Sequence, residues 1–204
     1  MKIAIVDYGM GNIHSILGAL KHLGISEVTV TDSYEVLAKV DKLILPGVGS
    51  FAKAMKEIVK RNLDTSLKTI VLEQKKPILG ICLGMQIMSQ SSTEDGYTEG
   101  LGFVKTKVDK FTDISLPVPH VGFNQVQLPK TATKLYKGFN DAPDFYFTHS
   151  YKMQGEDVME VATCNYEVSF IASFEKENIA GVQFHPELSQ NNGLKLIHNF
   201  LNEF

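Results

Sequence analysis

The stretch ILGICLGMQIM, residues 78–88, decides how the rest of the chain is interpreted. Apolar residues lead into Cys82 as in a buried strand, and a helix-forming run follows it. Gly80 and Gly84 stand two residues before and two residues after the cysteine. This spacing matches a nucleophile elbow, a sharp strand-to-helix turn that holds a reactive side chain between small neighbours. The stretch therefore predicts a strand, a tight turn and a helix of an α/β protein.

Such a turn would give Cys82 a particular electrostatic environment. The first N–H groups of the helix and its positive dipole end would face the sulfur and favour a thiolate. The backbone N–H of Leu83 would be placed to stabilise an oxyanion. A buried cysteine that packs as a small hydrophobe, beside glycines that only permit close packing, explains the same residues. The stretch alone leaves both interpretations open.

Before this turn, short apolar runs alternate with runs at helical spacing. The expected strands are KIAIVDYG (2–9), EVTVT (27–31), KLILPG (42–47) and PILGI (77–81), and the expected helices cover 13–23, the region of 36–40, 51–59 and the region of 67–71. Asn12 and Ser50 are expected N-caps, and Gly24 is an expected C-terminal stop. The alternation predicts right-handed crossovers and an open, mostly parallel, doubly wound sheet with helices on both faces.

From about Gly102 the pattern changes to short runs divided by turn residues. The runs are GFVKTKV (102–108), NQVQL (124–128), DFYFTHSY (144–151), EVATC (160–164), SFIASF (169–174) and IAGVQF (179–184). We expect added strands, some of them antiparallel, with the last two runs forming a hairpin. A helix is expected over 193–204. No repeat or linker interrupts the chain, so residues 1–204 are expected to form a single α/β domain.

Composition excludes several classes of protein. A formal net charge of -3 gives no electrostatic case for binding nucleic acid. Two cysteines do not make a disulfide framework. No apolar run approaches the roughly 20 residues that span a bilayer, and the N-terminus lacks the pattern of a signal peptide. We expect a soluble, cytoplasmic protein that binds neither nucleic acid nor a membrane.

A cysteine nucleophile needs a base, and His185 stands out among the six histidines. It ends the apolar run IAGVQF, and Glu187 follows two residues later, where a carboxylate can orient an imidazole. The Gly-rich loop PGVGSF, residues 46–51, leaves the third expected strand at the same sheet edge as Cys82. Its N–H groups can turn toward an anion, although a tight turn explains the same residues.

Other short motifs carry no cofactor or metal. DYGMGN, residues 7–12, looks like a dinucleotide-binding loop but lacks the third glycine of that fingerprint. The chain has no P-loop lysine motif and no Cys/His spacing typical of zinc. We therefore expect neither a cofactor nor a metal.

Several longer motifs together resemble the class I, or triad-type, glutamine amidotransferases. They are GICLGMQ (80–86), GVQFHPE (181–187), VDYGMGN (6–12), PGVGSF (46–51), PHVGFN (119–124) and YFTHSY (146–151). Their order is that of the glutaminase subunits of imidazole glycerol phosphate synthase, which nearly the whole chain resembles. The resemblance implies a class I amidotransferase-like fold, in which Cys82 attacks the side-chain amide of glutamine, His185 transfers the proton and Glu187 orients His185.

The same resemblance implies further site residues. The oxyanion would be held by the N–H of Leu83 and by an N–H of Val48 or Gly49. Glutamine would be held by Gln86, Glu94 and Gly49 and by the backbone near Ser150 and Tyr151. The position of Glu94 depends only on its spacing from Cys82.

The implied partner is a cyclase subunit of TIM-barrel type, joined to this chain in a heterodimer. It would receive ammonia and make imidazole glycerol phosphate for histidine biosynthesis. No motif in this chain suits the phosphorylated nucleotide of that reaction, so its site would lie on the partner. The resemblance places Asn12, His120, Phe123 and Leu188 at the partner interface.

Two of these interface positions depart from the family pattern, since Leu188 stands where lysine is usual and Phe123 where tryptophan is usual. Loss of the lysine removes an ion pair, and phenylalanine lacks the indole donor. One interpretation is a histidine-pathway glutaminase with compensating changes in its partner. The alternative is a paralogue that supplies ammonia to a divergent synthase for amidation of a surface-polysaccharide sugar.

Two other classes of protein fit the residues less well. A regulatory homologue without turnover has no chemical reason to retain Cys82, His185 and Glu187 together. A cysteine peptidase would have little use for the amide-binding residues Gln86 and Glu94.

Overall fold

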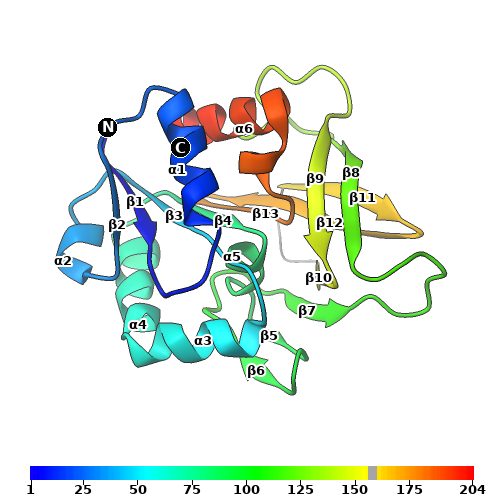
Figure 1. Cartoon of the computed structure of the whole chain (residues 1–204), viewed down its shortest axis with the longest axis horizontal. Helices are drawn as coiled ribbons and strands as arrows, with labels where there is room; N and C mark the ends of the chain where they lie inside the picture. Colours follow the sequence, from blue (N-terminus) through cyan, green and yellow to red (C-terminus); the bar gives the residue numbers. More distant parts are fainter. Residues whose placement is uncertain (156–159) are drawn as a thin grey trace.

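In the part of the chain that this computed structural model describes, residues 1–155 and 160–204, nine strands form one sheet (Figure 1). The strand order is β2-β1-β3-β4-β13-β12-β11-β8-β9. The strands are β2 (Val28–Thr31), β1 (Ile3–Val6), β3 (Lys42–Leu45), β4 (Ile78–Ile81), β13 (Ile179–Val182), β12 (Val168–Lys176), β11 (Glu160–Tyr166), β8 (His120–Gln127) and β9 (Asp144–His149).

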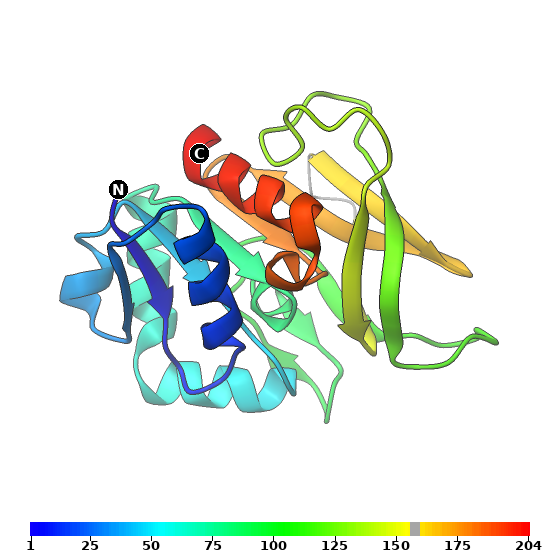
Figure 2. The same cartoon turned by 45° about the horizontal axis from the view of Figure 1, so that its top comes forward.

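Helices cover both faces of the parallel part of this sheet, as predicted. The helices are α1 (Ile13–His22), α2 (Tyr34–Leu37), α3 (Phe51–Lys60), α4 (Leu63–Leu67) with the π-helical turn η1 (Lys68–Glu73), α5 (Leu83–Gln86) and α6 (Gln190–Glu203). Successive side chains of β1 point to opposite faces of the sheet, and this divides the core into two clusters. Ile3 and Ile5 pack in one cluster with α1 and α6, two helices that lie on the same face of the sheet (Figure 2). Ala4 and Val6 pack in the other cluster, with α2, α3 and α4.

Strand direction changes at β13. Strands β2, β1, β3, β4 and β13 are parallel to one another. Strands β12, β11, β8 and β9 continue the sheet in antiparallel fashion. The predicted hairpin between the last two strands is confirmed, with Lys176 opposite Ile179. The α/β class is therefore confirmed, but the sheet is mixed and its antiparallel part is larger than expected.

A second, small sheet was not predicted. Its strands are β10 (Tyr151–Gln154), β7 (Lys107–Lys110), β5 (Ser91–Ser92) and β6 (Thr98–Glu99). The run DFYFTHSY, expected as one strand, is divided at Ser150 between β9 of the large sheet and β10 of the small one. Because the backbone turns there from one sheet to the other, Ser150 lies at the junction of the two sheets.

The strand predicted over GFVKTKV is wrong for most of its length. Only Lys107 and Val108 lie in β7, and the preceding residues form an irregular loop. Leu101 N donates to Ile87 O at 2.8 Å, and Phe103 N donates to Met88 O at 2.9 Å. Backbone groups before β7 thus bond to the residues that follow α5, and these pairings need no strand.

The expected helix caps differ from one another. Ser50 Oγ accepts a hydrogen bond from Lys53 N at 3.5 Å, as predicted for an N-cap. Gly24 follows α1 with a φ of +78°, as expected for a helix stop. Asn12 makes no capping side-chain hydrogen bond, because its backbone (φ -86°, ψ 62°) is not in the extended conformation that caps adopt. No helix within the described ranges is long and apolar enough to cross a membrane.

Candidate active site

The predicted strand, turn and helix around Cys82 are confirmed. Cys82 follows β4, precedes α5 and has φ 54° and ψ -111°. A positive φ is strained for a residue with a side chain and is typical of functional turns. A Cβ at Gly84 would lie 1.9 Å from Leu45 O, and a Cβ at Gly80 would lie 2.8 Å from Met85 N. The two glycines are needed because strand and helix approach each other so closely at this corner.

His185 and Glu187 form a buried pair beside this corner. His185 Nδ1 and Glu187 Oε1 are 2.8 Å apart, and their side chains are 4% and 1% exposed. Among the described residues, His185 Nε2 has no hydrogen-bond partner, so it is the ring nitrogen available to Cys82. Burial lowers the pKa of His185, but its interactions with Cys82 and with Glu187 outweigh burial and raise that pKa to about 10. The arrangement suits an imidazolium beside a thiolate.

Cys82 and His185 open into a pocket of about 300 Å³. The residues that line it are Val48, Gly49, Cys82, Leu83, Gln86, Glu94, Pro119, Thr148, His149, Ser150, Tyr151 and His185. Every residue predicted for catalysis, the oxyanion hole or glutamine binding is among them except Glu187, which lies behind His185. The pocket thus brings together the ends of β3 and β4, the segment after β13 and the junction of β9 with β10.

The Gly-rich loop after β3 packs directly against the elbow. A Cβ at Gly47 would lie 2.7 Å from Gly84 N and 2.6 Å from Tyr8 Oη. Tyr8 Oη donates to Pro46 O at 2.7 Å, and Gly49 has a φ of +102°. Burial raises the pKa of Tyr8, and the nearby Cys82 charge adds to this shift. The sequence did not identify Tyr8 as part of the site, although it stands in the motif DYGMGN.

Comparison of the sequence with known proteins identifies the family of this chain. The family described as glutamine amidotransferase class-I matches residues 4–204. The chain belongs to this family. It is 45% identical over 199 residues to imidazole glycerol phosphate synthase subunit HisH 1 of Campylobacter jejuni, covering 97% of this chain and 98% of that protein. It is 40% identical over 201 residues to subunit HisH of Aquifex aeolicus, covering 98% of this chain and 96% of that protein.

Solved structures show the same fold for this amidotransferase. One structure, described as a glutamine amidotransferase, superposes with a TM-score of 0.75 at 18% identity, covering 97% of this chain and 96% of that one. Another glutamine amidotransferase, from Thermotoga maritima, gives a TM-score of 0.66 at 15% identity, covering 100% and 83% of the two chains. At these identities the likeness concerns the fold alone.

The polar residues of the amidotransferase pocket are already partly engaged. Gln86 Nε2 donates to Tyr151 O at 3.0 Å and to Gln183 Oε1 at 2.9 Å, so only its Oε1 is left for a ligand. Glu94 Oε2 accepts from Phe51 N at 2.8 Å. Burial raises the pKa of Glu94, and this bond partly opposes the shift. Gln183 was missed by the sequence analysis, although it stands within GVQFHPE.

His120 and His149 form a buried pair that the sequence did not predict. His120 Nδ1 and His149 Nε2 are 3.1 Å apart, and His120 also stacks on Tyr166 with ring centroids 4.0 Å apart. Burial lowers the pKa of His120 to about 4 and the pKa of His149 to about 3. His120 was expected at a partner surface, but its ring packs against Phe147, Tyr166 and Phe170, and the residue is only 3% exposed.

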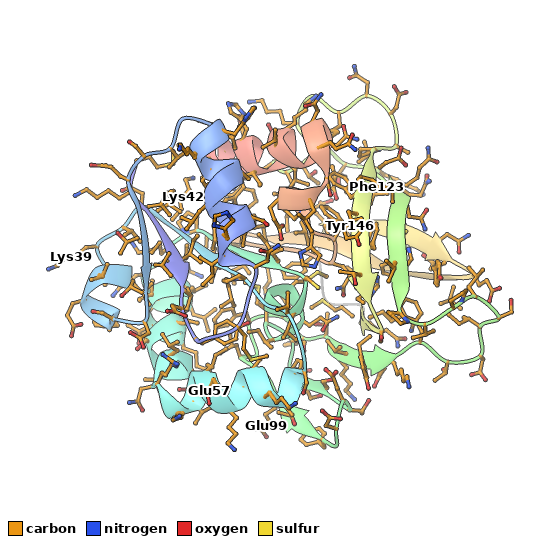
Figure 3. The ribbon with its side chains drawn as sticks, viewed as in Figure 1. Lys39, Lys42, Glu57, Glu99, Phe123 and Tyr146 are labelled. Atoms are coloured by element: carbon orange, nitrogen blue, oxygen red, sulfur yellow. The ribbon has the colours of Figure 1, made fainter. Side chains whose placement is uncertain are left out.

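The other predicted interface residues lie outside the pocket. Phe123 and Leu188 are exposed, and Phe123 lies edge-on to Tyr146 with ring centroids 5.6 Å apart (Figure 3). Asn12 is partly exposed. Four exposed apolar residues, which we call the apolar rim, are Val48, Val121, Phe123 and Leu188, and of these Val48 lines the pocket. Within residues 1–155 and 160–204, no cluster of three or more His, Cys, Asp or Glu side chains could hold a metal ion.

Proposed function

We propose that the chain is the glutaminase subunit of an imidazole glycerol phosphate synthase and releases ammonia from L-glutamine. The observation that carries the proposal is the placement of Cys82, on a strained turn, in one pocket with His185, whose other nitrogen meets the buried Glu187. Full-length identity of 40–45% to proteins named HisH supports the pathway.

In the proposed reaction the Cys82 thiolate attacks the side-chain amide carbon of glutamine. The carbonyl electrons move to oxygen, which is held by the Leu83 N–H and an N–H of Val48 or Gly49. His185 then gives its proton to the nitrogen, the C–N bond breaks and ammonia leaves. Water, deprotonated by His185, attacks the thioester, and glutamate leaves as the thiolate re-forms.

Glutamine fits the donors and acceptors that remain in the pocket. Gln86 Oε1 and the Glu94 carboxylate can accept from the α-ammonium group, since both Gln86 amide hydrogens are used within the protein. Backbone N–H groups near Ser150 and Tyr151 can hold the α-carboxylate. A volume of about 300 Å³ is at the lower end for ligand pockets, which suits a single amino acid.

The proposed partner is a cyclase of TIM-barrel type that docks on the apolar rim and receives the ammonia. The rim residues Val121, Phe123 and Leu188 are 56%, 51% and 40% exposed. Because aromatic residues are enriched in protein interfaces, the exposed Phe123 suits a protein partner.

The loop from Gly47 to Gly49 is the proposed point of regulation. Gly47 is held by contacts with Tyr8 and Gly84, whereas Val48 is 41% exposed and Gly49 has a left-handed backbone. A change of the partner's ligand state would therefore act on the second half of the loop and turn its N–H groups toward the oxyanion. Weak glutaminase activity is expected for the isolated chain.

The test is glutamate release from glutamine by the chain with its organism's histidine-pathway cyclase, with and without the cyclase's nucleotide ligand. The Cys82→Ala variant is the blank, and cyclase activity on free ammonia is the control for the partner. Strong ligand-dependent stimulation supports the proposal. No stimulation of a chain paired with an active cyclase overturns the histidine pathway and favours a paralogous glutaminase for another synthase. Leu188 and Phe123 would then be the first residues to exchange.

A further inference from the structure

Two groups outside the His185–Glu187 pair approach the sulfur of Cys82. Cys82 Sγ lies 3.9 Å from the backbone oxygen Thr148 O, which can only accept a hydrogen bond. Gln183 Nε2, which can only donate, lies 3.7 Å from the same sulfur. The first contact suits a protonated thiol and the second suits a thiolate. The balance between the two forms therefore depends on the direction in which the Gln183 amide points.

A series of hydrogen bonds, anchored at the backbone carbonyl of Tyr151, fixes the direction of the Gln183 amide. Tyr151 O accepts from Gln86 Nε2 at 3.0 Å and from His149 Nδ1 at 2.8 Å. Because a carbonyl cannot donate, the NH₂ group of Gln86 must face Tyr151 O. The other hydrogen of this NH₂ group meets Gln183 Oε1 at 2.9 Å. The oxygen of Gln183 is thereby occupied, and its NH₂ group faces Cys82.

The sheet holds Gln183 beside Cys82. Val182, the last residue of β13, is paired with Ile81 of β4, so the next residue on each strand is Gln183 and Cys82. Cys82 N donates to Val182 O at 2.8 Å, and Gln183 N donates to Ala172 O at 2.7 Å. The Gln183 side chain is fully buried, and a buried amide in a core strand is retained only with its hydrogen bonds made.

We propose that Gln183 is a catalytic residue whose amide N–H donates to the Cys82 thiolate, and that Gln86 and Tyr151 O are positioning groups that keep this donor aimed at the sulfur. The use of the thiolate in glutamine hydrolysis rests on the proposed function. The hydrogen bond raises the thiolate fraction before attack and stabilises the thiolate again when glutamate leaves. No proton is transferred to or from Gln183 in either step.

The test measures how fast iodoacetamide alkylates Cys82 as a function of pH in the complex of full chain and cyclase. Gln183→Met keeps the side-chain length and removes the donor, and Gln183→Glu keeps the shape but adds a carboxylate. Loss of a hydrogen bond to a charged group is expected to slow alkylation of Gln183→Met at neutral pH about tenfold. Its pH profile should move to higher pH by about one unit with the high-pH plateau retained. Gln183→Glu should move the profile further, because its carboxylate would stand beside the thiolate.

The control is Asn199→Leu, which removes another buried amide with two hydrogen bonds, to Leu135 O and Lys137 O. It should lower the unfolding midpoint without moving the alkylation profile. The other titratable groups near the sulfur, His185, His149, Glu94 and Tyr8, stay the same in every variant.

An alkylation profile of Gln183→Met that superposes on the wild type overturns the inference, as does a lower plateau without a shift. If Gln183→Met does not fold, the Gln86→Met variant is the test instead. Its alkylation profile should also move to higher pH, but by less than one unit, about half as far. Glutamate release separates this inference from the proposed function. A wild-type complex that does not hydrolyse glutamine, combined with a shifted profile, rejects the function and supports the hydrogen bond.

Discussion

On the side of β3 and β4 the pocket is formed by backbone segments that glycines allow to touch. On the side of β9 and β10 it is lined by residues 148–151, among which the buried His149 contacts His120 of β8. At the first wall, Gly47, Gly80 and Gly84 have no room for a Cβ. At the second wall, His120 and His149 hydrogen-bond to each other in a neutral state. We call these the glycine wall and the histidine wall.

The two walls should respond to different changes, the glycine wall to added side-chain volume and the histidine wall to protonation. The glycine wall contains few groups that titrate, but an added Cβ would meet backbone atoms as close as 1.9 Å, which leaves no tolerance for larger residues. The histidine wall is set by hydrogen bonds whose direction depends on tautomers, so protonation should disturb it more than small changes of volume. Single substitutions on each wall and outside both can test this contrast.

The largest effect is expected from Gly84→Ala. The new Cβ would meet Leu45 O at 1.9 Å, and its nearest neighbours are all backbone atoms of Leu45 and Pro46, so no flexible side chain can move away. We expect the free energy of unfolding to fall by about 3 kcal/mol or more, as for severe overpacking. Urea unfolding measures this, with Gly18→Ala as the matched control. Gly18 lies in α1 with nothing within 4 Å of its Cβ position, so alanine there should stabilise by about 0.5–1 kcal/mol. Equal stability of the two variants would contradict the steric account.

The second effect concerns acid. Burial lowers the pKa of His120 to about 4 and of His149 to about 3, below the value of about 6.5 in an unfolded chain. Stability from these neutral histidines is present above pH 6.5 and is lost as the pH falls toward the folded-state pKa values, because only the unfolded chain gains the protons. Both proteins should lose stability between pH 6 and pH 4, but His120→Gln should lose it less steeply. The difference between the two slopes should be about 1.4 kcal/mol per pH unit.

Urea unfolding at several pH values measures this slope. His22→Gln is the control, because His22 is exposed on α1 and should leave the slope unchanged. Parallel slopes for His120→Gln and the wild type would show that the histidine wall is not the acid-sensitive part.

A smaller effect is expected from Tyr8→Phe, at the edge of the glycine wall. It removes the 2.7 Å hydrogen bond to Pro46 O and leaves that buried carbonyl without its partner. We expect the free energy of unfolding to fall by about 1–2 kcal/mol. Chemical denaturation checks this, and Tyr97→Phe is the control because Tyr97 is 74% exposed. No difference between the two variants would mean that Tyr8 does not hold the loop.

The smallest effect is expected outside the histidine wall, on the apolar rim. Val121→Ala should weaken binding to the cyclase by about 0.5–1 kcal/mol and leave alkylation of Cys82 unchanged. Val59→Ala is the matched control, because Val59 is 54% exposed on α3 and Val121 is 56% exposed on β8. Titration calorimetry measures both. Equal affinities would place the partner on another surface.

Much of the site could be predicted because it is encoded by short segments. The elbow depends on Gly80, Cys82 and Gly84, and the base and its carboxylate are two residues apart. Steric and hydrogen-bonding requirements over so few residues are visible in the order of residues alone. The order of expected strands also predicted that the loop after β3 and the end of β4 would meet at one sheet edge.

Other parts could not be predicted, because their reasons lie in segments far apart in the chain. Gln86 and Gln183 are 97 residues apart, and His120 and His149 are 29 apart. Nothing local marks these side chains as partners, since the histidine pair depends on the register of β8 with β9 and the glutamine pair on the packing of α5 beside β13. The burial of His120 and the division of DFYFTHSY at Ser150 have the same origin.

The sequence by itself thus determined the α/β class, the nucleophile turn and the His-Glu pair, since each follows from the conformational limits of a few consecutive residues. Only the tertiary structure decided which buried polar groups face one another and in which direction their hydrogen bonds run. The physical reason is that a buried donor must find an acceptor somewhere in the fold, and the packing of distant strands determines where.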